Sequence, residues 1–472
     1  MGMGGVVPGK TLFESRGYRG GEAQEGSGFT LGIESFLMSG GSHEVLLLEA
    51  SNRLGGRILT HREEDWYVEL GPMRLPKHHR LVREFIKKLN LKLNPFYNSN
   101  KMGWYLVNNV RARAGDVEQN PDILQYPVHH SERGKSASEL YNQTLDKVTS
   151  NCSALKGKYD SFSTKEYLIK EGKLSQGAIR MIGDVLGKES LFYMSFLSSV
   201  IAFFSFSEKS YDEITGGFDQ LPEAFYQDLL GEVQFNSPVV KIIRGKDHVR
   251  VLYRQSHAAI PRPVPADYVL VTATAKATRL IQFSPPLSAK KTQALRSIHY
   301  VRGTKIFLVC SEKFWEKDGI FYGKSITDRP ARSIYYPNHS FDNRTGVILA
   351  SYTWGDEAEF FLPLDDERCV DVVLADLAAV HHVPQNYIRN VCRKHVVKKW
   401  GLDKYSMGSF ALFTPYQYSD YSQALFQNEG RVYFAGEHTA MPAGWIEAAM
   451  KSAVRAAGRI HSAIKAGGRQ TR

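Results

Sequence analysis

The sequence predicts an α/β fold in which short buried strands alternate with helices around a parallel sheet. Its 472 residues are 43% hydrophobic and 23% charged, which is enough apolar material for two or three lobes. Residues 45–48 read as a short apolar strand, and residues 266–274 read as a strand buried on both faces. Buried strands of this kind are typical of a Rossmann-like lobe.

The strand at residues 45–48 ends in an acid and leads into a glycine pair followed by an arginine. An acid at the end of the second strand of such a lobe accepts both ribose hydroxyls, and this is the role expected of Glu49. Gly55 and Gly56 let the backbone approach a phosphate, and Arg57 neutralises it. An ordinary buried strand followed by a turn is the alternative.

The segment before this strand matches the dinucleotide pattern poorly. Gly26 and Gly28 stand about twenty residues before Glu49, where a phosphate-binding turn is expected. Leu31 occupies the position where close packing requires a glycine, and residues 20–25 cannot form a buried first strand. We therefore expect residues 4–28 to be irregular, residues 33–42 to form a short helix, and residues 1–42 to be an atypical start of the lobe.

Composition narrows the classes of partner. The net charge is +11, but Lys and Arg are scattered along the chain, so a nucleic-acid partner is not expected. The four cysteines show no CxxC spacing, which argues against zinc, and no metal site is expected. Residues 191–206 are apolar but shorter than the roughly 18 residues of a membrane span, so they predict a buried helix.

The signals for localisation disagree. The first ten residues lack the basic and apolar regions of a signal peptide. In contrast, the sequence contains N-glycosylation sequons, which suggest a secretory route; they begin at Asn142, Asn151, Asn338 and Asn343.

Downstream of Arg57 the chain reads Glu69-Leu70-Gly71-Pro72-Met73-Arg74. Gly71 and Pro72 form a tight connection that can lay backbone against a flat ring, and Arg74 is a charged fork suited to a carboxylate. A surface arginine in a turn is the alternative. Together with the glycine pair and Arg57, this motif resembles the flavin-dependent L-amino-acid oxidases of the venom type, in the flavin amine oxidase superfamily, from about His43 to Ala463.

The resemblance implies three domains. An FAD-binding domain would comprise residues 1–75, 218–298 and 425–472, and a mixed-sheet substrate domain residues 76–112 and 299–424. Residues 113–217, which have helical patterns with capped starts, would form a helical domain. Some relatives place a histidine before the return from that domain. Because this sequence has no histidine between His130 and His248, the identity of a general base stays open.

The resemblance also assigns residues to the cofactor. The residues implied to hold FAD are Glu49, Arg57, Gly71, Pro72, Met73, Arg74, Val239, Gly436, Glu437, Trp445 and Ile446. A helix beginning near Ile446 carries apolar residues at Ile446, Met450, Val454, Ala457 and Ile460, a three-to-four spacing. Its free N–H groups can stabilise negative charge on a flavin. A plain strand, loop and helix is the alternative.

On the substrate side, the resemblance implies that Arg74 and Tyr352 bind a carboxylate and that the Gly444 carbonyl binds an amine. Trp445 would pack at the flavin face. Phe410 and Trp400 would line an apolar side-chain pocket. Lys305 precedes an apolar strand, usually a solvated edge position, but the matching lysine of the family holds a water near the flavin and assists reoxidation by dioxygen.

The cysteines are also interpreted through the resemblance. Cys310 and Cys392 match a family disulfide, Cys369 is a spare thiol, and Cys152 lacks the amino-terminal partner that the family provides.

The implied activity is oxidative deamination of L-amino acids to 2-oxo acids, ammonia and hydrogen peroxide, with FAD as cofactor and dioxygen as acceptor. The apolar pocket favours hydrophobic or aromatic amino acids as substrates. A secreted homodimer without a membrane span is expected. Two alternatives stay open: a mono- or polyamine oxidase, and a non-enzymatic relative with an incomplete FAD site.

Overall fold

The structure, a computed structural model, describes residues 10–13, 44–149, 159–206, 210–227, 233–255, 260–339, 341 and 345–468. Several features expected from the sequence lie outside these ranges: the turn at Gly26 and Gly28, the helix at residues 33–42, Cys152, and the sequons at Asn151 and Asn343. Within them, every helix is too short or too polar to cross a membrane.

A five-stranded parallel sheet forms the first lobe, in the order β10-β2-β1-β14-β23. Its strands are β10 (Val233–Gln234), β2 (Glu44–Leu48), β1 (Lys10–Phe13), β14 (Tyr268–Val271) and β23 (Val432–Phe434). Every residue of β14 and β23 is buried, because apolar side chains cover both faces of the sheet. The predicted α/β class with a parallel sheet is confirmed.

The prediction that residues 4–28 are irregular is wrong for Lys10–Phe13. The backbone of this segment pairs in parallel with β2 on one side and with β14 on the other, so it fills the central position of the sheet. Two neighbouring strands supply partners for the backbone of β1, which allows a segment of only four residues to form a strand. The first strand therefore lies earlier in the chain than the position directly before Gly26.

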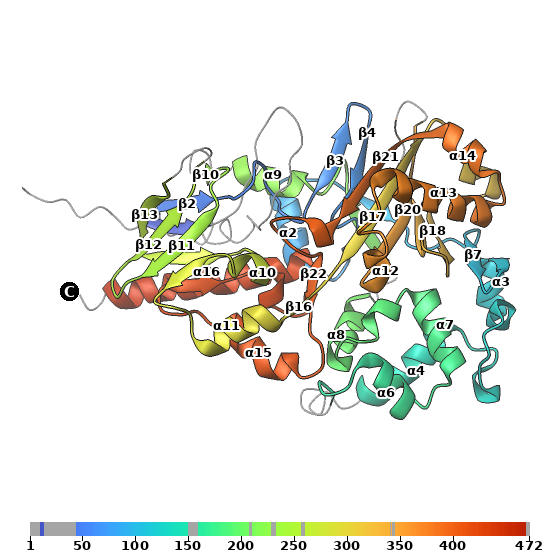
Figure 1. Cartoon of the computed structure of the whole chain (residues 1–472), viewed down its shortest axis with the longest axis horizontal. Helices are drawn as coiled ribbons and strands as arrows, with labels where there is room; N and C mark the ends of the chain where they lie inside the picture. Colours follow the sequence, from blue (N-terminus) through green and yellow to red (C-terminus); the bar gives the residue numbers. More distant parts are fainter. Residues whose placement is uncertain are drawn as a thin grey trace, which may run out of the picture.

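Two layers cover this sheet (Figure 1). One is a four-stranded sheet in the order β13-β12-β11-β15, formed by β13 (Arg262–Ala266), β12 (Val249–Tyr253), β11 (Val239–Arg244) and β15 (Gln282–Ser284). The other is the long helix α16 (Ile446–Gly468), which packs Ala453, Ala457 and Ile460 against the sheet. Val454, expected on the apolar face of this helix, is instead 41% exposed, and its neighbour Ala453 makes the contact.

A seven-stranded mixed sheet forms the second lobe, in the order β21-β17-β20-β19-β18-β7-β8. Its strands are β21 (Cys392–Lys399), β17 (Gly303–Cys310), β20 (Gly346–Trp354), β19 (Ser333–Tyr336), β18 (Gly323–Thr327), β7 (Trp104–Val107) and β8 (Val110–Arg113). All eight residues of β17 are buried, and helix α13 (Asp366–His381) covers one face. A disulfide joins Cys310 to Cys392, and Cys369 is a buried free thiol.

A cluster of helices packs at one end of the second lobe (Figure 1). It contains α3 (Ala114–Gln119), η1 (Pro121–Leu124), η2 (His130–Glu132), α4 (Ala137–Thr149), α6 (Thr164–Lys170), α7 (Gln176–Leu186), η4 (Glu189–Leu191) and α8 (Phe196–Phe206). Ser163 caps α6 by accepting a hydrogen bond from the backbone N–H of Glu166, as its sequence pattern predicts. The run 191–206 contains α8, a helix and not a membrane span.

The remaining elements connect these layers. Three small β structures lie between the lobes. They are the hairpin of β3 (Thr60–Glu63) and β4 (Trp66–Glu69), the sheet of β5 (Leu75–Pro76), β9 (Tyr211–Ile214) and β6 (Leu93–Phe96), and the pair β16 (His299–Val301) and β22 (Phe410–Leu412). The other helices are α2 (Arg80–Lys88), α9 (Gln220–Gln227), α10 (Ala275–Thr278), α11 (Ala289–Ser297), η5 (Phe314–Asp318), α12 (Asp356–Glu359), α14 (Gln385–Val391), η6 (Trp400–Leu402), α15 (Gln417–Phe426) and η7 (Glu437–Thr439).

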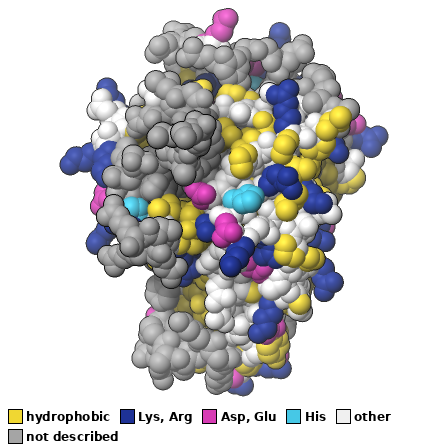
Figure 2. Space-filling view, turned by 90° about the vertical axis from the view of Figure 1, so that its left-hand side faces the viewer, with side chains coloured by type: hydrophobic (Ala, Val, Ile, Leu, Met, Phe, Trp, Pro, Cys, Tyr) yellow, Lys and Arg dark blue, Asp and Glu magenta, His cyan; other side chains and the backbone are white. Residues whose placement is uncertain are grey.

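The surface charge is dispersed on the face shown in Figure 2, where Lys and Arg side chains alternate with hydrophobic and acidic ones. This distribution agrees with the scattered basic residues of the sequence and does not favour a nucleic-acid partner on that face.

Candidate active site

A cavity of about 1270 Å³, part of it open to solvent, lies between the two lobes. Its walls come from the segment after β4, from β17, β20 and β22, from η6 and from the loop that precedes α16. Most residues expected at the site line this cavity: Arg57, Gly71, Pro72, Met73, Arg74, Lys305, Tyr352, Trp400, Phe410, Glu437, Gly444, Trp445 and Ile446.

Three expected cofactor residues do not line the cavity and lie instead at or near the edge of the parallel sheet. Glu49 follows β2, is 1% exposed, and accepts a hydrogen bond of 2.7 Å from the backbone N–H of Ser51. Gly436 follows β23 with φ 123°, a conformation that favours glycine, and Val239 begins β11. The carboxyl ends of parallel strands meet at one edge, which is where α/β sheets bind nucleotides.

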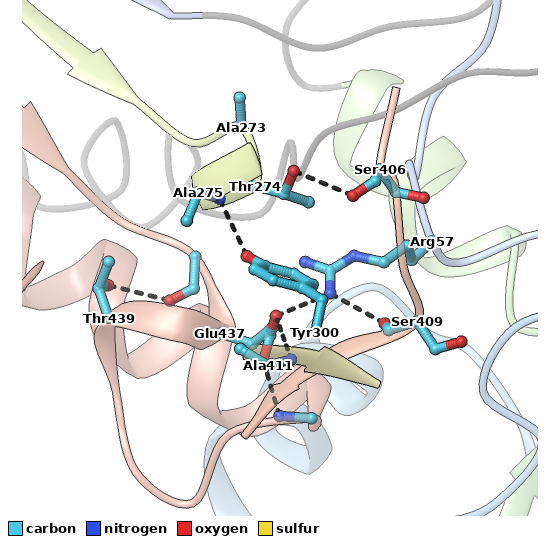
Figure 3. A network of polar contacts seen from close by, with 12 residues as sticks. Arg57, Ala273, Thr274, Ala275, Tyr300, Ser406, Ser409, Ala411, Glu437 and Thr439 are labelled. Carbon is cyan, nitrogen blue, oxygen red and sulfur yellow. Dashed lines mark hydrogen bonds and ion pairs between the residues drawn. The ribbon is translucent and has the colours of Figure 1, made fainter. Parts of the chain in front are cut away.

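Arg57 and Glu437 form the central ion pair of this edge (Figure 3). The Arg57 Nη1 donates to Glu437 Oε1 at 2.7 Å and to the Ser409 carbonyl at 3.0 Å. The Glu437 carboxylate also accepts hydrogen bonds from the backbone N–H groups of Ala411 and Gly444. Burial opposes the charge on Arg57, but Glu437 outweighs it and raises the pKa of Arg57 above its ordinary value. The pair is therefore fixed from three segments.

The backbone around this pair favours glycine at the expected positions, through lack of space at Gly71 and Gly55 and through backbone conformation at Gly55 and Gly444. A Cβ on Gly71 would lie 2.0 Å from the carbonyl oxygen of Arg57. Gly55 has φ 86° and Gly444 has φ 81°, both in the left-handed region. Gly71 therefore allows its backbone to pass directly beside that of Arg57 at the cavity wall.

Arg74 lies on the substrate side of the cavity. Its Nη1 donates to the Asn98 side chain at 3.1 Å and to the Tyr335 hydroxyl at 3.3 Å, and its guanidinium lies 5.6 Å from the centroid of the Tyr211 ring. Burial opposes its charge, but the tyrosine hydroxyls outweigh this and raise the pKa of Arg74. The alternative of a surface arginine in a turn is wrong.

Tyr352 and Trp354 extend the same wall from β20. Burial raises the pKa of Tyr352, so its hydroxyl stays protonated and can donate a hydrogen bond. The Trp354 ring lies edge-on to Tyr352, with centroids 5.3 Å apart, and edge-on to Phe410, with centroids 6.1 Å apart. The three rings form an aromatic wall beside Arg74.

Lys305 lies on the interior strand β17, opposite Tyr352 on β20, and is 1% exposed. Its Nζ donates to the backbone carbonyls of Glu69 at 2.7 Å and Gly71 at 2.6 Å. Burial lowers the pKa of Lys305 and Arg74 lowers it further, while Glu69 raises it. The usual role of a solvated edge lysine is therefore excluded.

Trp400 and Trp445 close two further sides. Trp400 is 5% exposed, and its indole N–H donates to the Leu70 carbonyl at 2.8 Å, which fixes the backbone leading into Gly71. Trp445 lies edge-on to the ring of His79, with centroids 4.9 Å apart.

The sequence interpretation missed several cavity residues, chiefly His79, Leu191, Trp354 and Ser409. Trp354 could have been found, because residues two apart on a strand face the same side and Tyr352 is assigned to the site. Leu191 comes from the helical cluster; the resemblance implies that this domain walls the substrate entrance, but it assigns none of the domain's residues to the site. His79, at the amino end of α2, is a buried histidine on the cavity wall.

Comparisons with known proteins agree with this site. The chain matches the family described as "Flavin containing amine oxidoreductase" over residues 36–461. It is 48% identical over 446 residues to an L-amino-acid oxidase of Gloydius halys and 49% identical over 446 residues to one of Echis ocellatus. Each alignment covers 93% of this chain and 88% of the relative.

Solved structures share the fold at low identity. Cyclohexylamine oxidase from Brevibacterium oxydans IH-35A has a TM-score of 0.79 and 16% identity, covering 97% of this chain and 100% of that one. Putrescine oxidase bound to putrescine has a TM-score of 0.76 and 18% identity, covering 98% of this chain and 99% of that one. These likenesses concern the fold alone.

The chain belongs to the flavin-containing amine oxidoreductases. The two relatives compared at about half identity are both named L-amino-acid oxidases. Family membership implies an FAD cofactor.

The residues present fit this cofactor. The buried acid at the end of β2, the glycines with positive φ after it and the ion pair beside the cavity supply the pieces that a dinucleotide requires. In addition, the buried hydroxyl of Ser409, on the cavity wall, has no hydrogen-bond partner within the described part of the chain. A polar ligand in the cavity would satisfy it.

Proposed function

We propose that this protein is an FAD-dependent oxidase that deaminates L-amino acids to 2-oxo acids and releases ammonia and hydrogen peroxide. The observation that carries the proposal is the position of Arg74, a partly buried and charged guanidinium that lines the cavity together with Tyr352. A guanidinium and a hydroxyl donor together suit a carboxylate, which simple amine substrates lack.

Each substrate group has a proposed partner. Arg74 and Tyr352 bind the carboxylate, and the Gly444 carbonyl accepts a hydrogen bond from the amine. Phe410 and Trp400 hold the side chain, and Trp354 adds an aromatic wall. A cavity with these walls favours hydrophobic or aromatic amino acids.

The cofactor is held by residues from both lobes. Those proposed are Glu49, Arg57, Gly71, Pro72, Met73, Arg74, Val239, Gly436, Glu437, Trp445 and Ile446. FAD, when bound, accepts a hydride from the α-carbon and passes two electrons to dioxygen, while water converts the imino acid to the 2-oxo acid and ammonia. Lys305 is proposed to act in the oxygen half-reaction, since a cation or hydrogen-bond donor stabilises the charge that develops on oxygen.

The experiment compares L-phenylalanine with phenethylamine, the same molecule without its carboxylate, by peroxide release. We expect Arg74→Ala to raise the KM for L-phenylalanine by at least about 50-fold, because it removes charge-assisted hydrogen bonds. Arg80→Ala is the control, since Arg80 is exposed at the first residue of α2. The KM of this control should not change.

Three outcomes would contradict the proposal. Equal activity on D-phenylalanine would contradict stereospecific binding of the substrate by Arg74 and Tyr352. Faster turnover of phenethylamine or putrescine than of L-phenylalanine would support a mono- or polyamine oxidase. A purified protein without the yellow absorption of flavin would support the non-enzymatic alternative.

The domain division follows the resemblance. Residues 1–75, 218–298 and 425–472 are assigned to FAD binding, residues 76–112 and 299–424 to the substrate, and residues 113–217 to the helical domain. The parallel sheet, the seven-stranded sheet and the helical cluster each fall in one of these units, which supports the assignment.

Secretion and a homodimer are also proposed. The resemblance to venom-type L-amino-acid oxidases supports secretion, and the sequon residue Asn142 is exposed on α4. Treatment with a glycosidase should reduce the mass of protein expressed in eukaryotic cells.

For the homodimer, sedimentation equilibrium should give about twice the chain mass of 53.2 kDa. A mass equal to one chain would contradict the dimer.

A further inference from the structure

Glu69 is a buried carboxylate beside the cavity that the proposed function does not use. It is 9% exposed at the end of β4, directly before the cavity residues Leu70 and Gly71. Its carboxylate accepts hydrogen bonds from the Thr60 hydroxyl at 2.9 Å and from the Phe218 backbone N–H at 2.7 Å. Neither donor carries a charge, so a cation elsewhere must stabilise this acid if it is ionised.

Lys305 and Arg62 both interact with Glu69 as cations, and Lys305 is the one on the cavity wall. The lysine Nζ donates a hydrogen bond to the backbone carbonyl of Glu69, which holds the amine next to this residue. The two side chains interact electrostatically in a site where both are almost fully buried. Burial raises the pKa of Glu69 and lowers the pKa of Lys305, so both shifts favour the pair of neutral forms.

The charge state of Lys305 decides whether its amine can donate a hydrogen bond to a molecule in the cavity. A charged lysine has three N–H donors and a neutral one has two. The carbonyls of Glu69 and Gly71 use two donors. The charged form therefore offers one further N–H to a molecule in the cavity, whereas the neutral form offers a lone pair.

We propose that Glu69 is a positioning residue that sets the protonation state of Lys305, so that the charge on the carboxyl and the charge on the amine depend on each other next to the cavity. In one state the carboxylate is ionised and the lysine donates; in the other both are neutral and the lysine accepts. The consequence for dioxygen rests on the proposed function, in which Lys305 assists the oxygen half-reaction.

Other charged and titratable groups face this pair and contribute to its titration. Arg74 disfavours the charge on Lys305, whose Nζ also lies 4.8 Å from the centroid of the Tyr352 ring, and Asp219 disfavours the charge on Glu69. Arg62 and Tyr67 lie near Glu69. On the neighbouring strand β21, Lys398 lies opposite Lys305 and forms an ion pair of 2.9 Å with Asp403.

The test measures the titration of Lys305 directly. In the holoenzyme with lysine labelled by ¹³C at Cε, the Lys305 resonance is assigned by its loss in Lys305→Arg and followed against pH. Glu69→Gln preserves an acceptor for Phe218 but removes the negative charge. We expect the Lys305 midpoint to fall by about one pH unit or more, since a nearby opposite charge shifts a pKa by that amount.

Two further variants keep the test interpretable. Thr60→Val removes one donor to the Glu69 carboxylate and should lower the Lys305 midpoint by less than Glu69→Gln; it serves if Glu69→Gln does not fold. Asp219→Asn makes the same carboxyl-to-amide change nearby but removes an acid that opposes the charge on Glu69, so it should not lower the midpoint. An unchanged Lys305 midpoint in folded Glu69→Gln or Thr60→Val would overturn the inference.

A second measurement separates this inference from the proposed function. The rate at which the anaerobically reduced holoenzyme is reoxidised by dioxygen is measured against pH in the same variants. A shift of this profile that matches the Lys305 midpoint supports both proposals. A shifted resonance with an unchanged oxygen profile supports the control of the Lys305 charge by Glu69 and overturns the role of Lys305 in the oxygen half-reaction.

Discussion

The Arg57 guanidinium donates a 2.7 Å hydrogen bond to the Glu437 carboxylate, although the two residues are 380 positions apart. Their side chains are only 13% and 4% exposed. The pair joins the loop after the glycine pair to the segment that begins η7, and it does so at the wall of the cavity. Two halves of the nucleotide lobe are thus held together at the point where the cofactor is expected.

Glu437→Gln should give a folded protein with little bound flavin. The substitution leaves the Arg57 charge buried without its anion, which costs about 3–5 kcal/mol when a buried pair is broken. The ratio of visible flavin absorption to protein absorption measures the loss. Glu429→Gln is the matched control, because Glu429 pairs with Arg244 at 3.0 Å in the same lobe with side chains 14% and 17% exposed. Equal flavin content in both variants would contradict a cofactor role for Glu437.

Trp354→Ala should change substrate preference. The indole stands between Tyr352 and Phe410, so its removal enlarges the proposed side-chain pocket. We expect the ratio of kcat/KM for L-tryptophan to that for L-leucine to rise about tenfold, since pocket contacts are worth about 1–3 kcal/mol. Trp104→Ala, in the same sheet but away from the cavity, should lower stability and leave this ratio unchanged.

Stability should fall as pH rises through the titration of Glu357. Burial raises the pKa of this carboxyl from 4.5 to about 7, and Asp184 and Glu189 raise it while Arg332 opposes them. A raised pKa means that the folded protein binds the proton more tightly than the unfolded chain, so this contribution is present at low pH and lost between about pH 4.5 and 7.

Thermal unfolding at pH 5 and pH 8 measures this effect. The decrease in Tm between the two pH values should be smaller in Glu357→Gln than in the unmodified protein, and the difference corresponds to at most about 3 kcal/mol. Glu118→Gln is the control, because Glu118 is 65% exposed and pairs with Lys101. The same decrease in all three proteins would rule out Glu357 as the source.

Replacing the disulfide should lower stability without changing the active site. The bond between Cys310 and Cys392 closes a loop with a sequence separation of 82 and lies at the end of β17 far from Lys305 in that strand. In the chain-entropy view its loss costs about 4 kcal/mol. Cys310→Ser with Cys392→Ser should lower Tm but keep the KM for L-phenylalanine. Cys369→Ser, at a buried thiol outside the bond, tests the general cost of changing sulfur in this core.

The sequence by itself determined the features that depend on local pattern. The acid after an apolar strand placed Glu49 at the end of β2, and the three-to-four spacing after Gly444 predicted α16, since periodicity and turn residues act over a few positions. The motif around Arg74 was sufficient to indicate a carboxylate site through its resemblance.

Only the tertiary structure decided the features that depend on distant segments. Strand β1 could not be recognised, because its place depends on pairing with β2 and β14 and not on its own four residues. Lys305 has the pattern of an edge residue, yet strands on both sides make β17 an interior strand, and the amine is buried against the backbone of Glu69. Burial and the choice of partner arise when separate segments pack, and these decide the charges of the site.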